Sequence, residues 1–176
     1  MSEVSTQKEG NKSTKIIIII LCALALAVVV LAILHQGNIS ERLELQADGA
    51  FLVTVGADTH HVSMSDLRSI GAVAVSSSPR GVSRDFTGVP LVRIFDYFGI
   101  DYFEAETVIF TALDGFVTAI SIAEALDETN TFIVFEEDGQ PLGTREEGGL
   151  GPYMVVVARD QFPNRWARYL MEITLQ

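Results

Sequence analysis

Three consecutive serines, Ser76, Ser77 and Ser78, are the most conspicuous candidates for chemistry in this chain. A serine attacks a substrate only when a neighbouring base, itself oriented by a third group, takes its proton. The sequence assigns no histidine to that role. The adjacent His60 and His61 would point to opposite faces of a strand, which also argues against one metal ion held by both. We therefore expect a turn at the serines and a solvent-facing hairpin at the histidines.

Other residue types with chemical potential lack the spacing that a site needs. The acidic runs 136–138 and 146–147 do not follow the ligand spacing of a calcium-binding loop. The glycines in 148–151 precede a predicted strand, so no helix N-terminus favours a phosphate there. The single cysteine, Cys22, lies in an apolar run near the N-terminus. The rest of the chain can therefore form no disulfide, thiolate nucleophile or cysteine-held metal site.

That apolar run comprises the nineteen residues 16–34, which follow Lys15 and contain no charge, proline or glycine. A helix of this length spans about 28 Å, close to the thickness of the hydrocarbon core of a bilayer. A cleavable signal peptide has a shorter apolar stretch that ends at a small-x-small site, and this run ends without one. Lipid attachment at Cys22 is disfavoured by the preceding Leu21. The pattern predicts an uncleaved, single-pass transmembrane helix over 16–34.

The segments on either side of the run predict the topology. The lysines in 1–15 keep this polar, disordered tail in the cytoplasm. Residues 35–43 then form a linker, and 44–176 form one domain outside the cytoplasmic membrane. After the run, the chain has nine arginines, no lysine and 21 acidic residues. Such an acidic surface repels nucleic acid, so we expect no nucleic-acid partner.

Local patterns in 44–176 predict short strands and a few short helices. Apolar residues recur at helical spacing between Pro90 and Gly99, which predicts a helix over 91–98. Ser65 or Asp66 is expected to cap a second short helix, and Ser121 with its capping box a third. Alternating or continuous apolar runs predict strands over 51–55, 59–62, 72–75, 108–112, 116–120, 131–135, 152–158 and 169–175. This order is typical of an α+β domain with a mixed β-sheet.

Four segments carry a more specific signal. They are 85–91 (DFTGVPL), 108–116 (a strand that runs into Asp-Gly-Phe), 137–152 (EDGQPL leading to GGLGP) and 165–168 (Arg-Trp-x-Arg). In this order and spacing they resemble the molybdopterin-binding domain of the sulfite oxidase family. The resemblance covers about 44–176 and implies a sulfite-oxidase-like molybdopterin-domain fold, in the short, single-domain form.

The sequence departs from the family's pattern at three places. Family enzymes bind molybdenum through a cysteine, whereas the corresponding stretch 74–78 contains none. Met154 stands where a family arginine helps to hold the cofactor, and Gly149 stands where an asparagine is usual. A serine hydroxyl is a poorer metal donor than a thiolate, because it stays protonated near neutral pH. We therefore expect a retained scaffold without a cofactor, and molybdopterin is the alternative.

The arginines that border the family's cofactor cleft are candidates to bind an anion, because a guanidinium binds carboxylate or phosphate with two hydrogen bonds. The candidate cleft residues are Ser76, Ser77, Ser78, Arg80, Arg84, Asp114, Arg145, Arg165 and Arg168. Ion pairing with the many acids is the competing interpretation for each arginine. Trp166 is expected either in the core or lining the cleft.

The leading hypothesis is a membrane-anchored, extracytoplasmic and non-catalytic domain that binds a small, anionic ligand or an envelope protein partner. A molybdopterin-dependent oxidoreductase with an unusual metal ligand is one alternative. A structural subunit of an envelope complex is another.

Overall fold

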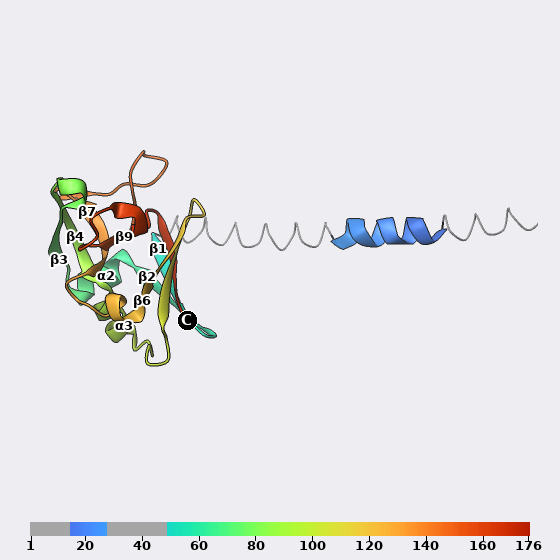
Figure 1. Cartoon of the computed structure of the whole chain (residues 1–176), viewed down its shortest axis with the longest axis horizontal. Coiled ribbons are helices and arrows are strands. Elements are labelled where there is room, and N and C mark those ends of the chain that lie inside the picture. Colours follow the sequence, from blue (N-terminus) through green and yellow to red (C-terminus); the bar gives the residue numbers. More distant parts are fainter. Residues whose placement is uncertain (1–14, 28–48) are drawn as a thin grey trace, which may run out of the picture. The chain divides into compact units, whose positions relative to one another are not determined.

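The computed structural model describes residues 15–27 and 49–176, and the chain divides into two units, Met1–Leu43 and Glu44–Gln176 (Figure 1). In the first unit, residues 15–27 form a helix whose apolar side chains are exposed. Within the described ranges, no helix has both the length and the hydropathy that crossing a bilayer requires. The predicted span 16–34 extends into residues outside these ranges, as do the predicted linker 35–43 and nearly all of the tail.

Five strands of the second unit form a mixed sheet in the order β2-β1-β10-β5-β6. They are β1 (Ala50–Val55), β2 (Asp58–Ser63), β5 (Thr107–Ala112), β6 (Val117–Ser121) and β10 (Leu170–Leu175). β1 and β10 run parallel, and the other neighbours are antiparallel. Gly56 and Gly115 turn the two hairpins with φ of 58° and 87°, a region that glycine adopts without steric cost. Both predicted hairpins are confirmed.

A second sheet is antiparallel throughout and is centred on β7. Its strands are β3 (Val73–Ser77), β4 (Arg84–Pro90), β7 (Thr131–Glu137), β8 (Gln140–Pro141) and β9 (Met154–Val157). β7 pairs with β4, and its two ends pair separately with β8 and β9. Residues 131–135 are all buried, as a central strand requires. Figure 1 labels β3, β4 and β7 on one side of this unit and β1, β2 and β6 on the other.

Short helices connect and cover the strands. They are α2 (Met64–Ile70), α3 (Leu91–Phe98), α4 (Ile122–Ala125) and two 3₁₀ turns, η1 (Pro79–Gly81) and η2 (Pro163–Arg165). α3 has the predicted bounds and ends at Gly99 in the left-handed conformation. The predicted cap of α2 was wrong. Ser63, the last residue of β2, is the cap, and Asp66 completes its capping box from the third helical position.

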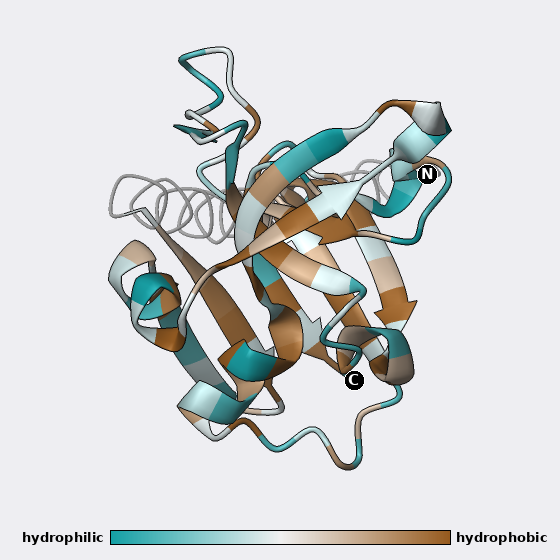
Figure 2. Cartoon of the chain, turned by 90° about the vertical axis from the view of Figure 1, so that its left-hand side faces the viewer, coloured by the Kyte–Doolittle hydropathy of each residue, from teal (hydrophilic) through white to brown (hydrophobic). Residues whose placement is uncertain are grey.

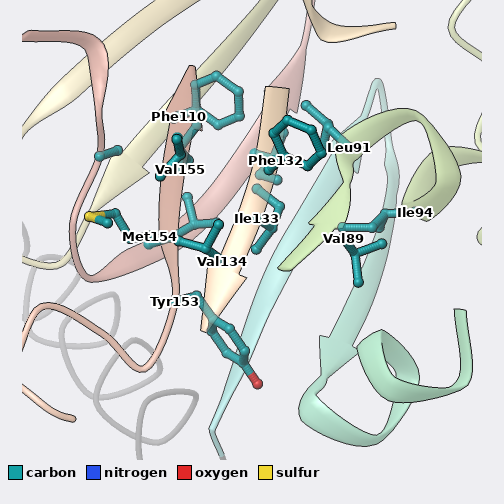
Figure 3. Close-up of a cluster of buried hydrophobic side chains, with 14 of the residues drawn as sticks. Val89, Leu91, Ile94, Phe110, Phe132, Ile133, Val134, Tyr153, Met154 and Val155 are labelled. Atoms are coloured by element: carbon teal, nitrogen blue, oxygen red, sulfur yellow. The ribbon is translucent and has the colours of Figure 1, made fainter. Parts of the chain in front are cut away.

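Apolar side chains from both sheets and from α2, α3 and α4 meet in one buried cluster. Phe110 of β5 and Ile133 of β7 are fully buried within it. Figure 3 shows residues of β4, α3, β5, β7 and β9 packed together in this cluster. In Figure 2 the strands carry much of the hydrophobic colouring, interrupted by hydrophilic bands. Burial of the strand faces is therefore what holds the domain together.

The prediction of one mixed sheet was incomplete, because the strands divide between two sheets and β4 was not predicted as a strand. β4 contains Gly88 and ends at Pro90, residues that are depleted in strands. Gly88 is needed here, because a Cβ at this position would lie 2.5 Å from the carbonyl oxygen of Ile133 on β7. β4 can therefore approach β7 this closely only with glycine at position 88.

Candidate functional site

The three candidate serines lie at the end of β3 and are not arranged as a nucleophilic site. Ser77 is buried, and its hydroxyl donates to the carbonyl oxygen of Ala158 at 2.8 Å. Ser76 is exposed and donates to Asp85 Oδ1 at 2.6 Å. Ser78 is exposed, and its side chain makes no capping bond to η1. The turn expected at the serines begins only at Ser78, because Ser76 and Ser77 still belong to β3. Two of the three hydroxyl protons are held by fixed acceptors.

Arg84 is held in an ion pair. Its Nε and Nη2 donate to the two carboxylate oxygens of Glu137 at 2.6 and 2.7 Å. The guanidinium also lies over the rings of Phe86 and Trp166, at 5.1 and 5.8 Å from their centroids. Both forms of contact are typical of a structural arginine. Arg84 therefore has little remaining capacity to bind a ligand.

Arg165 in η2 is held in a second network. It donates to Asp160 from Nε at 2.9 Å and to Glu124 from Nη1 at 3.0 Å. The hydrogen bonds to Asp160, followed by those to Glu124, raise the pKa of the Arg165 guanidinium. This network ties η2 to α4, so Arg165 holds these two segments together.

Arg80 and Arg145 are both exposed. Arg80 has a φ of 56°, and its backbone N–H donates to the carbonyl oxygen of Gln161 at 2.8 Å. The guanidinium of Arg145 lies over the ring of Tyr169 at 5.9 Å. Neither of these arginines lines the pocket described next.

A surface pocket of about 490 Å³ lies between the β5–β6 turn and the segment of η2. Its lining residues are Asp114, Phe116, Pro163, Asn164, Trp166 and Arg168. In Figure 1, the yellow tip of the β5–β6 hairpin and the red coil of η2 mark this upper end of the domain. Its volume is within the usual range for small-molecule sites. Of the nine candidate residues, the structure brings only Asp114 and Arg168 to this pocket.

Local structure fixes the pocket walls. Asp114 Oδ1 accepts from the backbone N–H of Phe116 at 3.0 Å, which shapes the turn. Trp166 is nearly buried, and its indole N–H donates to the carbonyl oxygen of Val157 at 3.2 Å. It is therefore both a core and a cleft-lining residue, the two settings expected for it. Arg168 precedes Tyr169, whose φ of 55° is unusual for a residue other than glycine.

Sequence reasoning missed Phe116, Pro163 and Asn164 as pocket residues. The Asp-Gly turn contains the signal for Phe116, because the residue after such a turn lies next to the turn aspartate. Asn164 carries no comparable signal, since it lines the pocket only through the 3₁₀ turn that Pro163 begins. Together the walls offer one guanidinium, one carboxylate, one amide and two aromatic rings. Such a set can bind a small anion with a planar part.

Two further positions bear on the cofactor expected from the resemblance. Met154 is fully buried on β9, and Figure 3 shows its sulfur within the core cluster. A Cβ at Gly149 would lie 2.2 Å from the carbonyl oxygen of Leu142. An arginine at 154 would thus be buried in the core, and an asparagine at 149 would collide with the backbone.

A family model described as "Oxidoreductase molybdopterin binding domain" matches residues 49–176, which is most of the chain. No curated protein matches the sequence. Among solved structures, the sulfane dehydrogenase SoxCD from Paracoccus pantotrophus is similar, with a TM-score of 0.59 and 13% sequence identity. The match covers 73% of this chain and 38% of that one, and at this identity it shows the fold alone. The resemblance is confirmed, and the chain belongs to the family of molybdopterin-binding oxidoreductase domains.

Proposed function

We propose that this chain is a membrane-anchored, extracytoplasmic member of the family that binds a small anionic ligand and carries out no redox reaction. The observation that supports the loss of redox chemistry best is the donor set at the end of β3. Residues 49–176 contain no cysteine, and the buried Ser77 hydroxyl donates to a backbone carbonyl. The family's thiolate ligand therefore has no substitute of similar softness in this domain.

The remaining donors do not fit a molybdenum centre either. To ligate through oxygen, Ser77 would have to lose its proton, which would leave a negative oxygen 2.8 Å from the carbonyl oxygen of Ala158. Ser76 is already directed to the carboxylate of Asp85. In the part of the chain that the structure describes, no three His, Cys, Asp or Glu side chains converge as metal ligands do. We therefore assign no reaction step to a metal.

The pocket beside η2 supports ligand binding. Arg168 is exposed, and within the described residues it makes no salt bridge, unlike Arg84 and Arg165. Phe116 and Trp166 add aromatic surface, and Asn164 adds an amide. An aromatic or otherwise planar carboxylate suits these walls, with its charge at Arg168.

The membrane anchor is proposed from the apolar residues 16–34 and the lysines before them. With the lysines in the cytoplasm, the acidic domain lies outside. The second candidate function, a molybdopterin-dependent oxidoreductase with an unusual ligand, is favoured by the family match and by the exposed Ser78 hydroxyl.

Metal and pterin analysis distinguishes the two functions. We expect the full chain, purified from molybdate-fed cells, to contain only traces of molybdenum by mass spectrometry and no fluorescent pterin after oxidation. A cysteine-containing family member made in the same cells is the positive control. Stoichiometric molybdenum with bound pterin in this chain would refute the proposal and establish the oxidoreductase.

Ligand binding is tested with benzoate and acetate as probes. We expect benzoate to stabilise the protein against heat more than acetate does, because its ring gains contact with the aromatic walls. Loss of the charged hydrogen bonds in Arg168→Ala costs about 1.5–3 kcal/mol, which weakens benzoate binding about tenfold or more. Arg93→Ala removes a half-buried arginine that pairs with Glu128 outside the pocket, and this variant should bind benzoate like the wild type. Equal thermal shifts in both variants would exclude this pocket.

A further inference from the structure

Aromatic side chains gather on the surface around the end of α3. This aromatic patch consists of His60, Tyr97, Phe98, Tyr102 and Phe103. The ring centroids lie 5.8 Å apart for His60 and Phe98, 5.1 Å for Tyr97 and Phe98, and 5.6 Å for Tyr102 and Phe103. Phe103 is 89% exposed and Tyr97 is 52% exposed. So much clustered aromatic surface is unusual for a surface that contacts only water.

Hydrogen bonds in the loop between α3 and β5 hold Phe103 in its exposed position. Asp101 Oδ1 accepts from the backbone N–H of Phe103 at 3.0 Å. On either side, Ile100 N–H donates to the carbonyl oxygen of Phe95 at 2.9 Å, and Glu106 N–H donates to that of Gln176 at 2.7 Å. The loop is therefore anchored at both ends while it holds the ring in solvent. An exposed phenylalanine forgoes the free energy of burying its ring, which an interface would recover.

Negative charge surrounds the patch. Residues 94–108 contain four acids and no basic residue. The acids are Asp96, Asp101, Glu104 and Glu106, and all four are exposed. The hydroxyl of Tyr102 donates to Asp96 Oδ1 at 3.3 Å, and the Asp96 charge raises the pKa of this tyrosine. The patch thus combines electron-rich rings with carboxylates, a set that complements cations.

We infer that the aromatic patch is a docking surface for a protein partner whose contacting segment carries arginine or lysine among apolar side chains. A guanidinium can stack on Tyr97 or Phe103 and at the same time pair with Glu104 or Asp101. A second copy of this acidic patch would repel it, and so would an anionic lipid surface. In Figure 1, α3 lies at the opposite end of the domain from the η2 pocket. The inference is therefore independent of the proposed ligand binding, and either can fail alone.

Site-specific photocrosslinking tests this inference. The photoreactive amino acid p-benzoylphenylalanine replaces Phe103 in the full chain, in the membranes of the cells that produce it. The control position is Val82, another exposed apolar side chain, at 63%. We expect a protein adduct at 103 and not at 82, mapped by mass spectrometry to a partner segment with an excess of arginine and lysine. Because both side chains are exposed, neither replacement should disturb the fold.

Charge reversal supplies the second arm of the test. With the photoreactive residue at 103, Glu104→Lys should reduce the adduct severalfold, because it replaces an attractive charge with a repulsive one. Circular dichroism verifies that the variant is folded. Equal labelling at 82 and 103, an adduct to lipid or to a second copy, a neutral or acidic mapped segment, or an adduct unaffected by Glu104→Lys would each overturn the inference.

Discussion

Replacing Gly149 with asparagine is expected to lower the free energy of unfolding by about 3 kcal/mol or more. The new Cβ would lie 2.2 Å from the carbonyl oxygen of Leu142 and 2.6 Å from that of Gly143. Both are backbone atoms, so no side-chain rotation can relieve the clash. The loop must open and lose three backbone hydrogen bonds, each worth about 0.5–1.5 kcal/mol. These are donated by the N–H groups of Gly149, Leu150 and Gly151 to Thr144, Leu142 and Gly143.

The neighbouring Gly148→Asn is the matched control. Gly148 has a φ of 77°, and a Cβ there would meet nothing within 4 Å. Asparagine tolerates this conformation better than most residues, so the cost should stay below about 1 kcal/mol. Thermal unfolding followed by circular dichroism should show a Tm drop of roughly 10 °C or more for Gly149→Asn and a small one for Gly148→Asn. Equal decreases in Tm for the two variants would mean that the close backbone contact at Gly149 does not determine the stability of the loop.

The same substitution bears on the departure from the family. Asparagine is the residue that the family usually has where this chain has Gly149. If Gly149→Asn opens the loop, the backbone around position 149 has a conformation that only a residue without a side chain can occupy. Met154 leads to the same conclusion, because it is buried where the family's arginine would need to reach a cofactor. These two departures are thus part of the packing of this domain.

Much of the fold was predictable because its signals are local. The helix 91–98 is defined by its apolar spacing and by Gly99, and the capping box at Ser121 lies within four residues. Pairing between distant segments leaves no such signal. β1 and β10 lie side by side although more than a hundred residues separate them. The division into two sheets depends on such pairings, so the strands could be predicted but their distribution could not.

The candidate site illustrates the same limit. Arg84 and Arg165 were proposed as anion-binding residues, and each is an ion-paired residue in the structure. Glu137 lies 53 residues from Arg84, and Glu124 lies 41 residues from Arg165, distances over which pairing cannot be read from sequence. Only Asp160, the other partner of Arg165, is near in the chain, five residues away. Arg168 has no such partner among the described residues. The sequence alone therefore does not distinguish Arg168 from the ion-paired Arg84 and Arg165, and the folded structure does.

Raising the pH from 10 to 12 is expected to lower the stability of the domain by about 2 kcal/mol through one side chain, Tyr153. This tyrosine is fully buried, and its hydroxyl donates to the carbonyl oxygen of Gly49. Burial, with a smaller effect of the Asp66 charge, raises the pKa of Tyr153 to about 12. In the unfolded chain the same group ionises near pH 10, so the phenolate favours unfolding. The stabilising effect is therefore complete below pH 10 and is lost toward pH 12, at about 1.4 kcal/mol per pKa unit.

Urea unfolding of the wild type and Tyr153→Phe at pH 9, 10, 11 and 12 measures this effect. Tyr153→Phe should lose about 1 kcal/mol at pH 9, because the bond to Gly49 is gone. Its stability should then fall less steeply above pH 10, since phenylalanine has no proton to release. Tyr97→Phe is the control, because the Tyr97 side chain is 52% exposed and its removal takes no buried hydroxyl from the domain, so this variant should keep the wild-type slope. If Tyr153→Phe kept the wild-type slope too, the alkaline loss of stability would arise from other groups. The hydrogen bond from the buried Tyr153 hydroxyl to Gly49 would then not link the start of β9 to the start of β1 as its geometry implies.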